Sequence, residues 1–522
     1  MARLRLLSGT LLALISVQPS FAAGVEGVAF PSSCSASAQI HLERGVAHLH
    51  SFQYEEAALE FDTARDVDRS CSMSYWGKAM TRVHPLWGER PTADAMDLGR
   101  RDTAAARRAG NQSPLENGYI TASSAFYDAP PTASHRDRLR AWSRAFARLH
   151  RAFPEDDNAT AFYALSLLAL GADGVNDRAN RRAAIRLLEP SFQRQPGHPG
   201  IVHYLVHATD HPEFAARGLN AARVYADIAP TSSHALHMPS HTFVRLGMWS
   251  EAIASNLRAA TAGEQAVLHH VGDYTYQIHA MEFLNHAYLQ IGQEAKAREQ
   301  HARLATVPGA SESEKRADLA LFIGRAAVEL HAWTEAASLP VPDLDPSWLS
   351  EVYWTRTVGA ARLGDPTSAR QNRALYARSV QALLEGRGAN VSLPASIRIA
   401  QFEADGWIAF AEGHPREALR LLRKAARVEA AEAGESVTVP AREMLADLLW
   451  ETGRSEQALR EYRLVLRTSP NRFNSLVGAG RVAHTLGQSA VARTYFGQVL
   501  AMVSADADRQ ELAEVRRLAA TP

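Results

Sequence analysis

The feature that most constrains the fold is a pair of histidines that recurs after 34 residues. His203 and His207 lie four positions apart in the string HYLVHATDH, and His237 and His241 lie four apart in HALHMPSH. Each member of the second pair follows its counterpart by 34 residues. A period of roughly 20–50 residues indicates stacked copies of one small unit, each of which buries its apolar face against its neighbours. We therefore expect a repeat protein.

The same period continues on both sides of the histidines. Small residues recur at positions 8, 20 and 27 of a repeat and an aromatic residue at position 24, where they let two helices approach and fill the gap between repeats. An N-terminal repeat has Gly45, Ala57, Phe61 and Ala64 there, and later repeats have Gly406 with Ala418 and Ala425, Ala446 with Ala458 and Tyr462, and Gly480 with Ala492 and Phe496. No stretch alternates in the way typical of strands. The sequence predicts an all-α helical solenoid.

The balance of charged residues indicates which classes of partner to expect. Lys plus Arg and Asp plus Glu each number 56 among the 522 residues, so the chain has no basic excess. Nucleic-acid binding draws on such an excess, and a membrane-spanning helix needs about 18 or more apolar residues in a row, which no stretch after the N-terminus provides. We expect no nucleic-acid partner and no stable membrane insertion of the mature chain.

The N-terminus has the pattern of a secretory signal peptide. Arg3 and Arg5 precede the apolar run Leu6–Val17, and Ser20 and Ala22 are small residues at the −3 and −1 positions of a cleavage site. The pattern predicts a signal peptide over residues 1–22 and a periplasmic or secreted protein. An uncleaved membrane anchor is the alternative.

The chain has two cysteines, Cys34 and Cys71, and both follow the predicted cleavage site. In an oxidising compartment an even pair near one end of a fold is expected to form a disulfide. Two free buried thiols are the alternative.

The repeat positions resemble those of tetratricopeptide (TPR) repeats over most of the mature chain. The central strings also resemble a group of exported bacterial repeat proteins with HYLxHAxDHP followed by HALHMPSHxFxRLGxW, a resemblance that implies no particular activity. We expect N-terminal helical repeats over 23–157, a central histidine-rich block over 158–305, a C-terminal repeat block over 316–505 and a tail over 506–522.

The resemblance implies that the first helix of each repeat, helix A, lines a concave groove that binds ligands. At about 100° per residue, positions 2, 5, 9 and 13 of helix A lie about 150° from the core positions 4, 7, 8 and 11. His203 and His207 take positions 5 and 9, as do His237 and His241. The same face carries His234 and His279 at position 2, Glu282 and His286 at 5 and 9, and His50, His84 and His211 at 13.

This arrangement predicts a transition-metal site. Imidazoles four residues apart on a helix project from adjacent turns, and neighbouring A helices lie about 10 Å apart, so the two pairs are expected to share one ion. The metal ligands we predict are His203, His207, His237, His241 and His279, and the additional groove ligands are His50, His84, His211, His234 and His286. Imidazole ligands favour zinc or copper over magnesium or calcium.

Two residues near the histidine pairs bear on the predicted metal site. Glu282 is the candidate catalytic residue, either as a ligand or as a base beside the metal. Pro239 lies between His237 and His241 and is expected to disturb the helix there, which makes the helical spacing of that pair less secure.

Two functions remain open. One is a metalloprotein, and an enzyme if a coordination position stays free for substrate. The other is a scaffold whose histidine-rich groove binds a peptide or protein partner without metal. Histidines that only hydrogen-bond between repeats are a third interpretation. The motifs HExxH, GxSxG and the Walker A loop do not occur in the sequence.

Overall fold

The computed structural model describes residues 28–86, 90–174, 177–270, 272–386, 393–432 and 437–520. The predicted signal peptide at 1–22 lies outside them.

The described residues form helices and contain no strand, so the predicted all-α solenoid is confirmed. The helices are α1 (Ala36–His50), α2 (Tyr54–Val67), α3 (Ser72–Met80), α4 (Ala93–Arg108), α5 (Pro114–Tyr127), α6 (His135–Ala152), α7 (Asp157–Ala172), α8 (Asp177–Arg194), α9 (Pro199–Thr209), α10 (Ala215–Ile228), α11 (Ser233–His237), α12 (Pro239–Arg245), α13 (Trp249–Leu268), α14 (Thr275–Gln290), α15 (Glu294–Leu304), α16 (Glu312–Glu329), α17 (Trp333–Ala337), the 3-10 helix η1 (Pro346–Trp348), α18 (Ser350–Arg362), α19 (Pro366–Gly386), α20 (Ala395–Ala411), α21 (Pro415–Glu432), α22 (Ala441–Glu451), α23 (Ser455–Thr468), α24 (Phe473–Thr485), α25 (Ser489–Met502) and α26 (Glu511–Ala519).

The repeat residues explain how the helices pack. Phe61 of α2 is fully buried between α1 and α3. A Cβ atom at Gly45 of α1 would lie 2.6 Å from its ring, and one at Gly77 of α3 would lie 2.4 Å from it. The glycines therefore make room for the phenylalanine, whose burial stabilises the fold by about 2–3 kcal/mol.

The turn after helix A also repeats. In six repeats a glycine with φ between +65° and +78° stands five residues before the alanine of position 20, that is, at position 15; these are Gly247, Gly292, Gly364, Gly413, Gly453 and Gly487. A left-handed residue turns the chain sharply towards helix B, and glycine adopts it without strain. Two repeats have another residue at position 15, Phe52 with φ +57° and His331 with φ +53°.

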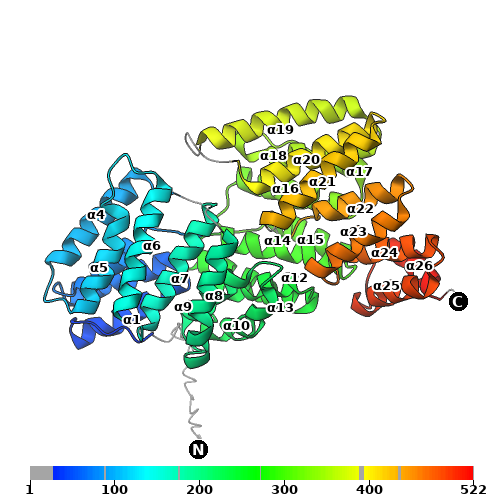
Figure 1. Cartoon of the computed structure of the whole chain (residues 1–522). Coiled ribbons are helices and arrows are strands. Elements are labelled where there is room, and N and C mark those ends of the chain that lie inside the picture. The colour runs from blue at the N-terminus through cyan, green and yellow to red at the C-terminus, as the bar shows by residue number, and fades with distance from the viewer. Residues whose placement is uncertain are drawn as a thin grey trace, which may run out of the picture.

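The superhelix folds back on itself. In Figure 1 the chain runs from α4–α6 at the left, through the central green helices, to α18–α21 at the upper right and α25 and α26 at the lower right. The C-terminal helices return to the centre, where Trp249 Nε1 donates to the Asn471 carbonyl (2.8 Å) and Asp508 N to the Gly292 carbonyl (2.8 Å). The predicted tail includes α26, whose Leu512 and Val515 are buried.

The two largest apolar cores among the described residues follow this course. One extends from Val28 to Leu330 and also includes Val437, and a second extends from Val328 to Leu518. The expected domain boundaries stay predictions. None of the helices in the described part of the chain is long and apolar enough to cross a membrane.

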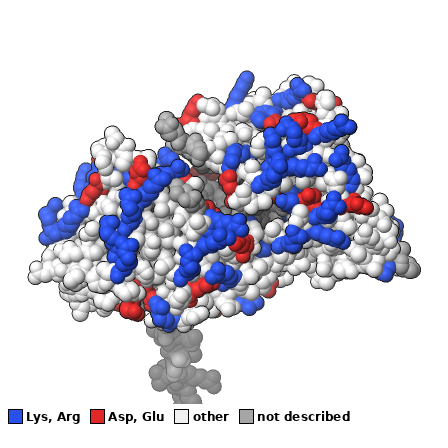
Figure 2. All heavy atoms as spheres, in the orientation of Figure 1, with Lys and Arg blue, Asp and Glu red and all other residues white. Residues whose placement is uncertain are grey.

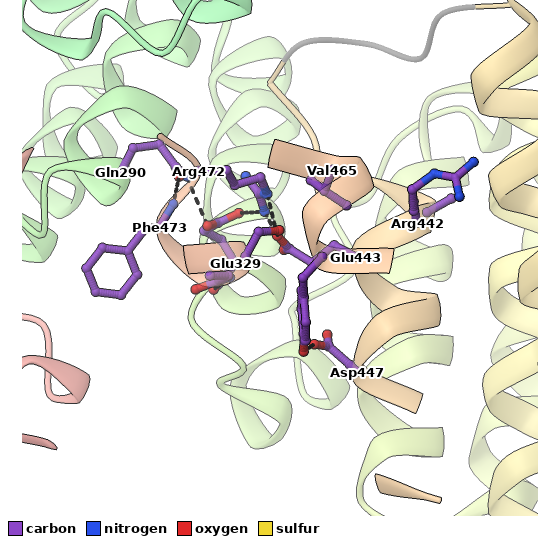
Figure 3. Close-up of polar contacts among 12 residues, drawn as sticks. Gln290, Glu329, Arg442, Glu443, Asp447, Val465, Arg472 and Phe473 are labelled. Atoms are coloured by element: carbon purple, nitrogen blue, oxygen red, sulfur yellow. Dashed lines mark hydrogen bonds and ion pairs between the residues drawn. The ribbon is translucent and has the colours of Figure 1, made fainter. Parts of the chain in front are cut away.

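A buried ion network joins the second core to the centre (Figure 3). Arg472 donates to Glu443 at 2.8 Å and to Glu329 at 2.6 Å, and all three side chains are at most 3% exposed. Next to it, Phe473 N donates to Gln290 Oε1 at 3.0 Å. On the surface, Figure 2 shows Lys and Arg side chains spread over one face of the molecule, with Asp and Glu between them.

Candidate metal centre

Six histidines from four central helices form two clusters. His203 and His207 of α9 meet His234 of α11, and we call these three the first triad. The second triad consists of His237 of α11, His241 of α12 and His279 of α14. Within each triad, one ring nitrogen from each histidine lies within 4.8 Å of the other two.

The structure thus divides the four histidines that we expected around one ion between two clusters. Each triad contains the histidines at positions 5 and 9 of one repeat and the histidine at position 2 of the next. The reason is geometric. His203 and His207 face the first turn of the next A helix, where His234 lies, and His237 lies one turn further along α11 and faces α14.

Pro239 interrupts the helix between the two ligands, as the sequence predicted. Helix α11 ends at His237 and α12 begins at Pro239. Proline lacks the amide hydrogen and clashes with the carbonyl four residues before it, but it suits the first turn of a new helix. The Nε2 atoms of His237 and His241 still lie 2.9 Å apart.

Hydrogen bonds fix the tautomer of four of the six histidines. In each case Nδ1 donates to an oxygen, which leaves Nε2 with its lone pair directed into the triad. The acceptors are the His50 carbonyl for His203 (2.6 Å), Asn256 Oδ1 for His237 (2.6 Å), Asp210 Oδ2 for His241 (2.9 Å) and Glu282 Oε2 for His279 (3.0 Å).

Two of these acceptors are themselves held in place. Asn256 Nδ2 donates to the Ala252 carbonyl at 2.8 Å, so its Oδ1 is the atom that faces His237. Arg245 Nε donates to the other oxygen of Asp210 at 2.9 Å. We did not single out Asp210 or Asn256 in the sequence. Asp210 stands within the HYLVHATDH string, but nothing in the sequence near Asn256 indicated its role.

The neutral form of the second triad therefore contains an unfavourable contact. With both imidazoles neutral and both Nδ1 atoms donating outwards, the Nε2 lone pairs of His237 and His241 face each other at 2.9 Å. Two acceptors at this distance repel each other, and the contact becomes attractive when a proton or a metal cation lies between them. His203 Nε2 and His234 Nε2 are 3.0 Å apart in the first triad.

Burial favours the neutral imidazole in four of the six histidines, which are His203, His207, His234 and His237. Burial lowers the pKa of His203 to about 3. Burial, followed by the neighbouring His203, holds the pKa of His207 and of His234 well below the ordinary value. For His237 the causes of a lowered pKa are burial and then His279. Neutral imidazole is the form that binds metal ions.

One phenylalanine packs against each triad. The Phe52 ring centroid lies 4.4 Å from that of His203 and 5.4 Å from that of His234. Phe283 lies 4.7 Å from His237 and 4.9 Å from His241 in the same measure. Phe52 is one of the two residues that replace the position-15 glycine, and a left-handed conformation costs a bulky residue about 1–2 kcal/mol. The Phe52 ring therefore packs against the first triad although its backbone conformation is unfavourable.

Only some of the histidines lie in an open groove as we expected, and the most exposed of the six is His279, whose side chain is 40% exposed. His203 is fully buried and His237 is 2% exposed. The turn after α1 covers the first triad, because the superhelix closes and brings α1 against α9. Tyr276 of α14 fastens this cover by donating to the Phe52 carbonyl at 3.2 Å.

The other predicted ligands have different surroundings, except His234, which belongs to the first triad. His50 contacts Tyr204 Oη and Asn158 Oδ1, both at 3.0 Å, and His84 stacks on Tyr54. His211 Nδ1 accepts a hydrogen bond from Glu213 N, and His286 packs against Trp249.

Glu282 lies beside the second triad. One carboxylate oxygen accepts from His279 Nδ1 and the other from Arg325. Burial alone would raise the pKa of Glu282, but the Arg325 charge and the His279 hydrogen bond outweigh it and hold the pKa at about 2. The carboxylate is therefore ionised and has both oxygens engaged.

Comparisons with protein-family models and with curated proteins found no match. Among solved structures, the chain is similar to a tetratricopeptide repeat protein from Parabacteroides merdae, with 15% identity over 69% of this chain and 99% of that chain and a TM-score of 0.25. It is also similar to the human IFIT1 dimer with m7Gppp-AAAA, with 14% identity over 90% of this chain and 91% of that chain and a TM-score of 0.37. A monomeric IFIT1 mutant with m7Gppp-AAAA has 11% identity over 88% of this chain and 95% of that chain and a TM-score of 0.38.

Proposed function

We propose that this helical-repeat protein binds two transition-metal ions, one at each histidine triad. The observation that carries the proposal is the contact between His237 Nε2 and His241 Nε2 at 2.9 Å, with both Nδ1 atoms already donating to oxygens. A cation between the two nitrogens removes the repulsion. The first triad supports the same conclusion, because it repeats the same three positions one repeat earlier.

The two ions would lie close together. His234 belongs to the first triad and His237 to the second, and they are three residues apart on α11. Residues at this spacing on a helix have Cβ atoms about 5–6 Å apart. The two triads are therefore neighbouring halves of one histidine centre.

Three neutral imidazoles per ion favour zinc or copper. A three-histidine site leaves a coordination position free, which is the feature that separates catalytic from purely structural zinc sites. When bound, such an ion supplies Lewis acidity to a water molecule or a small ligand. We therefore keep catalysis as part of the proposal, with the buried triads as the place where it would occur.

Glu282 acts on this centre by orienting His279. A general base works best with a pKa near the working pH, whereas that of Glu282 is about 2. The geometry thus favours the orienting role over that of the proton acceptor. Glu282→Gln should weaken metal affinity at the second triad by about 10–100-fold. If Glu282→Gln kept its metal affinity but lost catalytic turnover, the result would instead favour a role for Glu282 as the proton acceptor.

Metal analysis of the purified protein tests the proposal. After loading with zinc or copper at neutral pH and removal of free metal, wild type should retain two ions per chain, one for each triad. His237→Ala and His203→Ala should each lose one, and the exposed His484→Ala should lose none. Wild type without stoichiometric metal, or variants that bind as wild type does, would overturn the proposal. In the former case the alternative scaffold function, with a peptide or protein partner, would be the better interpretation.

Export is a further part of the proposal. Its support is the predicted signal peptide together with the disulfide between Cys34 and Cys71, a bond typical of oxidising compartments. Peptide mapping of non-reduced protein from the exported fraction should recover the linked peptides. Free thiols at both positions, or a protein that stays in the cytoplasm, would contradict it.

A further inference from the structure

A cavity of about 400 Å3 continues the inner face of the solenoid beyond the second triad. Glu282 and His286 of α14 form the wall nearest the triad, and residues of α16, α18, α19, α20, α21 and the segment before α22 form the others. Its volume is within the range of small-molecule sites in proteins, about 300–1,000 Å3. Most of its lining is apolar, with Val328, Ile399, Val437 and Val439 among the lining residues.

The carboxylates of this cavity outnumber its cations. Arg325 is the guanidinium in its wall, and it is already paired with Glu282 and Glu351. Glu329 is paired with Arg472. A cation in the cavity would therefore meet negative charge, and an anion would be repelled.

Two of the remaining carboxyl groups lie on neighbouring helices. Glu429 of α21 accepts hydrogen bonds from the amides of Ala441 (2.9 Å) and Arg442 (3.3 Å). Glu403 of α20 is 4% exposed, lines the cavity and has no hydrogen-bond or ion-pair partner within the described ranges. Burial, and then the nearby Glu429, raises the pKa of Glu403 well above its ordinary value. Such a group is costly unless a partner compensates it.

A second polar group in the same wall is also without a partner. The Nε1 atom of Trp354 on α18 is buried and has no hydrogen-bond acceptor among the residues that the structure describes. The cavity thus presents an unpaired carboxyl group and apolar walls, whereas the Trp354 Nε1 atom is covered by the surrounding side chains. A buried site built to hydrogen-bond a ligand has this composition.

We propose that this cavity binds a small organic amine, whose ammonium group pairs with Glu403 and whose apolar body lies against the valines and isoleucine of the wall. The ammonium group donates three hydrogen bonds and carries the charge that the excess carboxylates favour. If Glu403 is protonated before binding, it ionises on binding, so that each bound amine displaces about one proton to the solvent.

The test is calorimetric titration of the metal-loaded full chain with a matched pair of ligands. 2-Phenylethylamine and its neutral analogue 2-phenylethanol have the same body and differ at the terminal group. Wild type should bind the amine at least tenfold more tightly than the alcohol. A wider panel of primary arylalkylamines and alkylamines extends the search to other bodies that fit the cavity.

The variant that decides the matter is Glu403→Gln, which keeps the shape and removes the charge. It should lose the preference for amines, and the exposed Glu456→Gln should keep it. Thermal melting and metal content, measured on the same samples, show that the variant is folded and that the triads are intact. If no amine in the panel binds wild type, or if Glu403→Gln binds amines as wild type does, the proposal is overturned.

Two further measurements separate this site from the metal centre. Titrations in buffers of different ionisation enthalpy should report the release of about one proton per amine bound. His203→Ala, which removes a ligand of the more distant first triad, should bind amines as wild type does. If its metal content falls while amine binding persists, the two proposals stand independently.

Discussion

The central and C-terminal repeats bury polar side chains at the same repeat position and satisfy them in different ways. Position 5 is His237 in the second triad and Glu443 in the ion network, because Ala446 stands at position 8 of its repeat. Arg472, at the end of the same repeat, reaches Glu443 at 2.8 Å (Figure 3). His237 faces another lone pair instead, that of His241.

The difference shows which region of the fold satisfies its buried polar groups without a ligand. Opposite charges in low-dielectric surroundings attract, so the network of Glu329, Arg472 and Glu443 closes the superhelix without any ligand. Imidazole nitrogens whose hydrogens are committed elsewhere do not attract each other. The C-terminal ion network holds two parts of the chain together, and the central histidine triads provide a place for a cation. Three experiments test this contrast.

The largest expected effect is on the ion network. Arg472→Met should lower the free energy of unfolding by about 3–5 kcal/mol, because Glu329 and Glu443 would remain buried without their cation. Urea denaturation measures it. Arg467→Met, on the exposed side of α23, should have little effect. A stability of Arg472→Met within error of wild type would show that the network is not what closes the superhelix.

The second effect depends on metal. In metal-free protein, His241→Ala should change the free energy of unfolding by at most about 1 kcal/mol, because the loss of its packing and of its hydrogen bond to Asp210 is offset by removal of a repulsive contact, and Arg245 still pairs with Asp210. In wild type, zinc at 100 times its dissociation constant should add about 2.7 kcal/mol for each site. The His241→Ala variant should lose the part of this stabilisation that zinc at the second triad contributes. A large loss of stability in the metal-free variant would mean that His241 acts as a structural hydrogen-bond partner.

The third effect is the pH dependence of the metal-free protein. His203 has a pKa of about 3 in the folded chain and an ordinary value of 6.5 when unfolded. The contribution of His203 to the free energy of unfolding is complete above pH 6.5 and decreases as the pH falls. The reason is that the unfolded chain then binds a proton at this histidine and the folded chain does not. The expected slope is about 1.4 kcal/mol per pH unit for each such histidine.

Urea midpoints between pH 7.5 and 5 measure this slope. Glu329 of the ion network does not titrate in that window, since its pKa is about 2, because the charge of Arg472 outweighs the effect of burial. His203→Gln should show a shallower slope than wild type. An unchanged slope would indicate that His203 is protonated in the folded chain.

Much of the fold was predictable because it is local and periodic. The spacing of Gly45 and Phe61 indicates that two adjacent helices come close, and Gly480 and Phe496 repeat it, since a Cβ atom would lie 2.6 Å from the ring at Gly45 and 2.5 Å from it at Gly480. The interruption at Pro239 follows from the covalent structure of proline. The histidines at positions 5 and 9 could be assigned to one face of helix A for the same reason, since 3.6 residues per turn fix their direction.

The division into triads was not predictable from the period. The distance from His203 to His234 is 31 residues and that from His237 to His279 is 42, because α13 extends over 20 residues. A fixed spacing of 34 therefore finds the pairs and misses the third member of each triad. Which helix stands opposite depends on the course of the superhelix.

The sequence by itself determined the helical repeats, the turn residues and the face on which the histidines lie, because each follows from contacts within a repeat or with the next one. The tertiary structure decided which groups meet. Closure of the superhelix brought Phe52 over the first triad and Arg472 to Glu329. These contacts join residues that are 151 and 143 positions apart in the chain, and only the summed rise and twist of all the repeats between them determines whether they form.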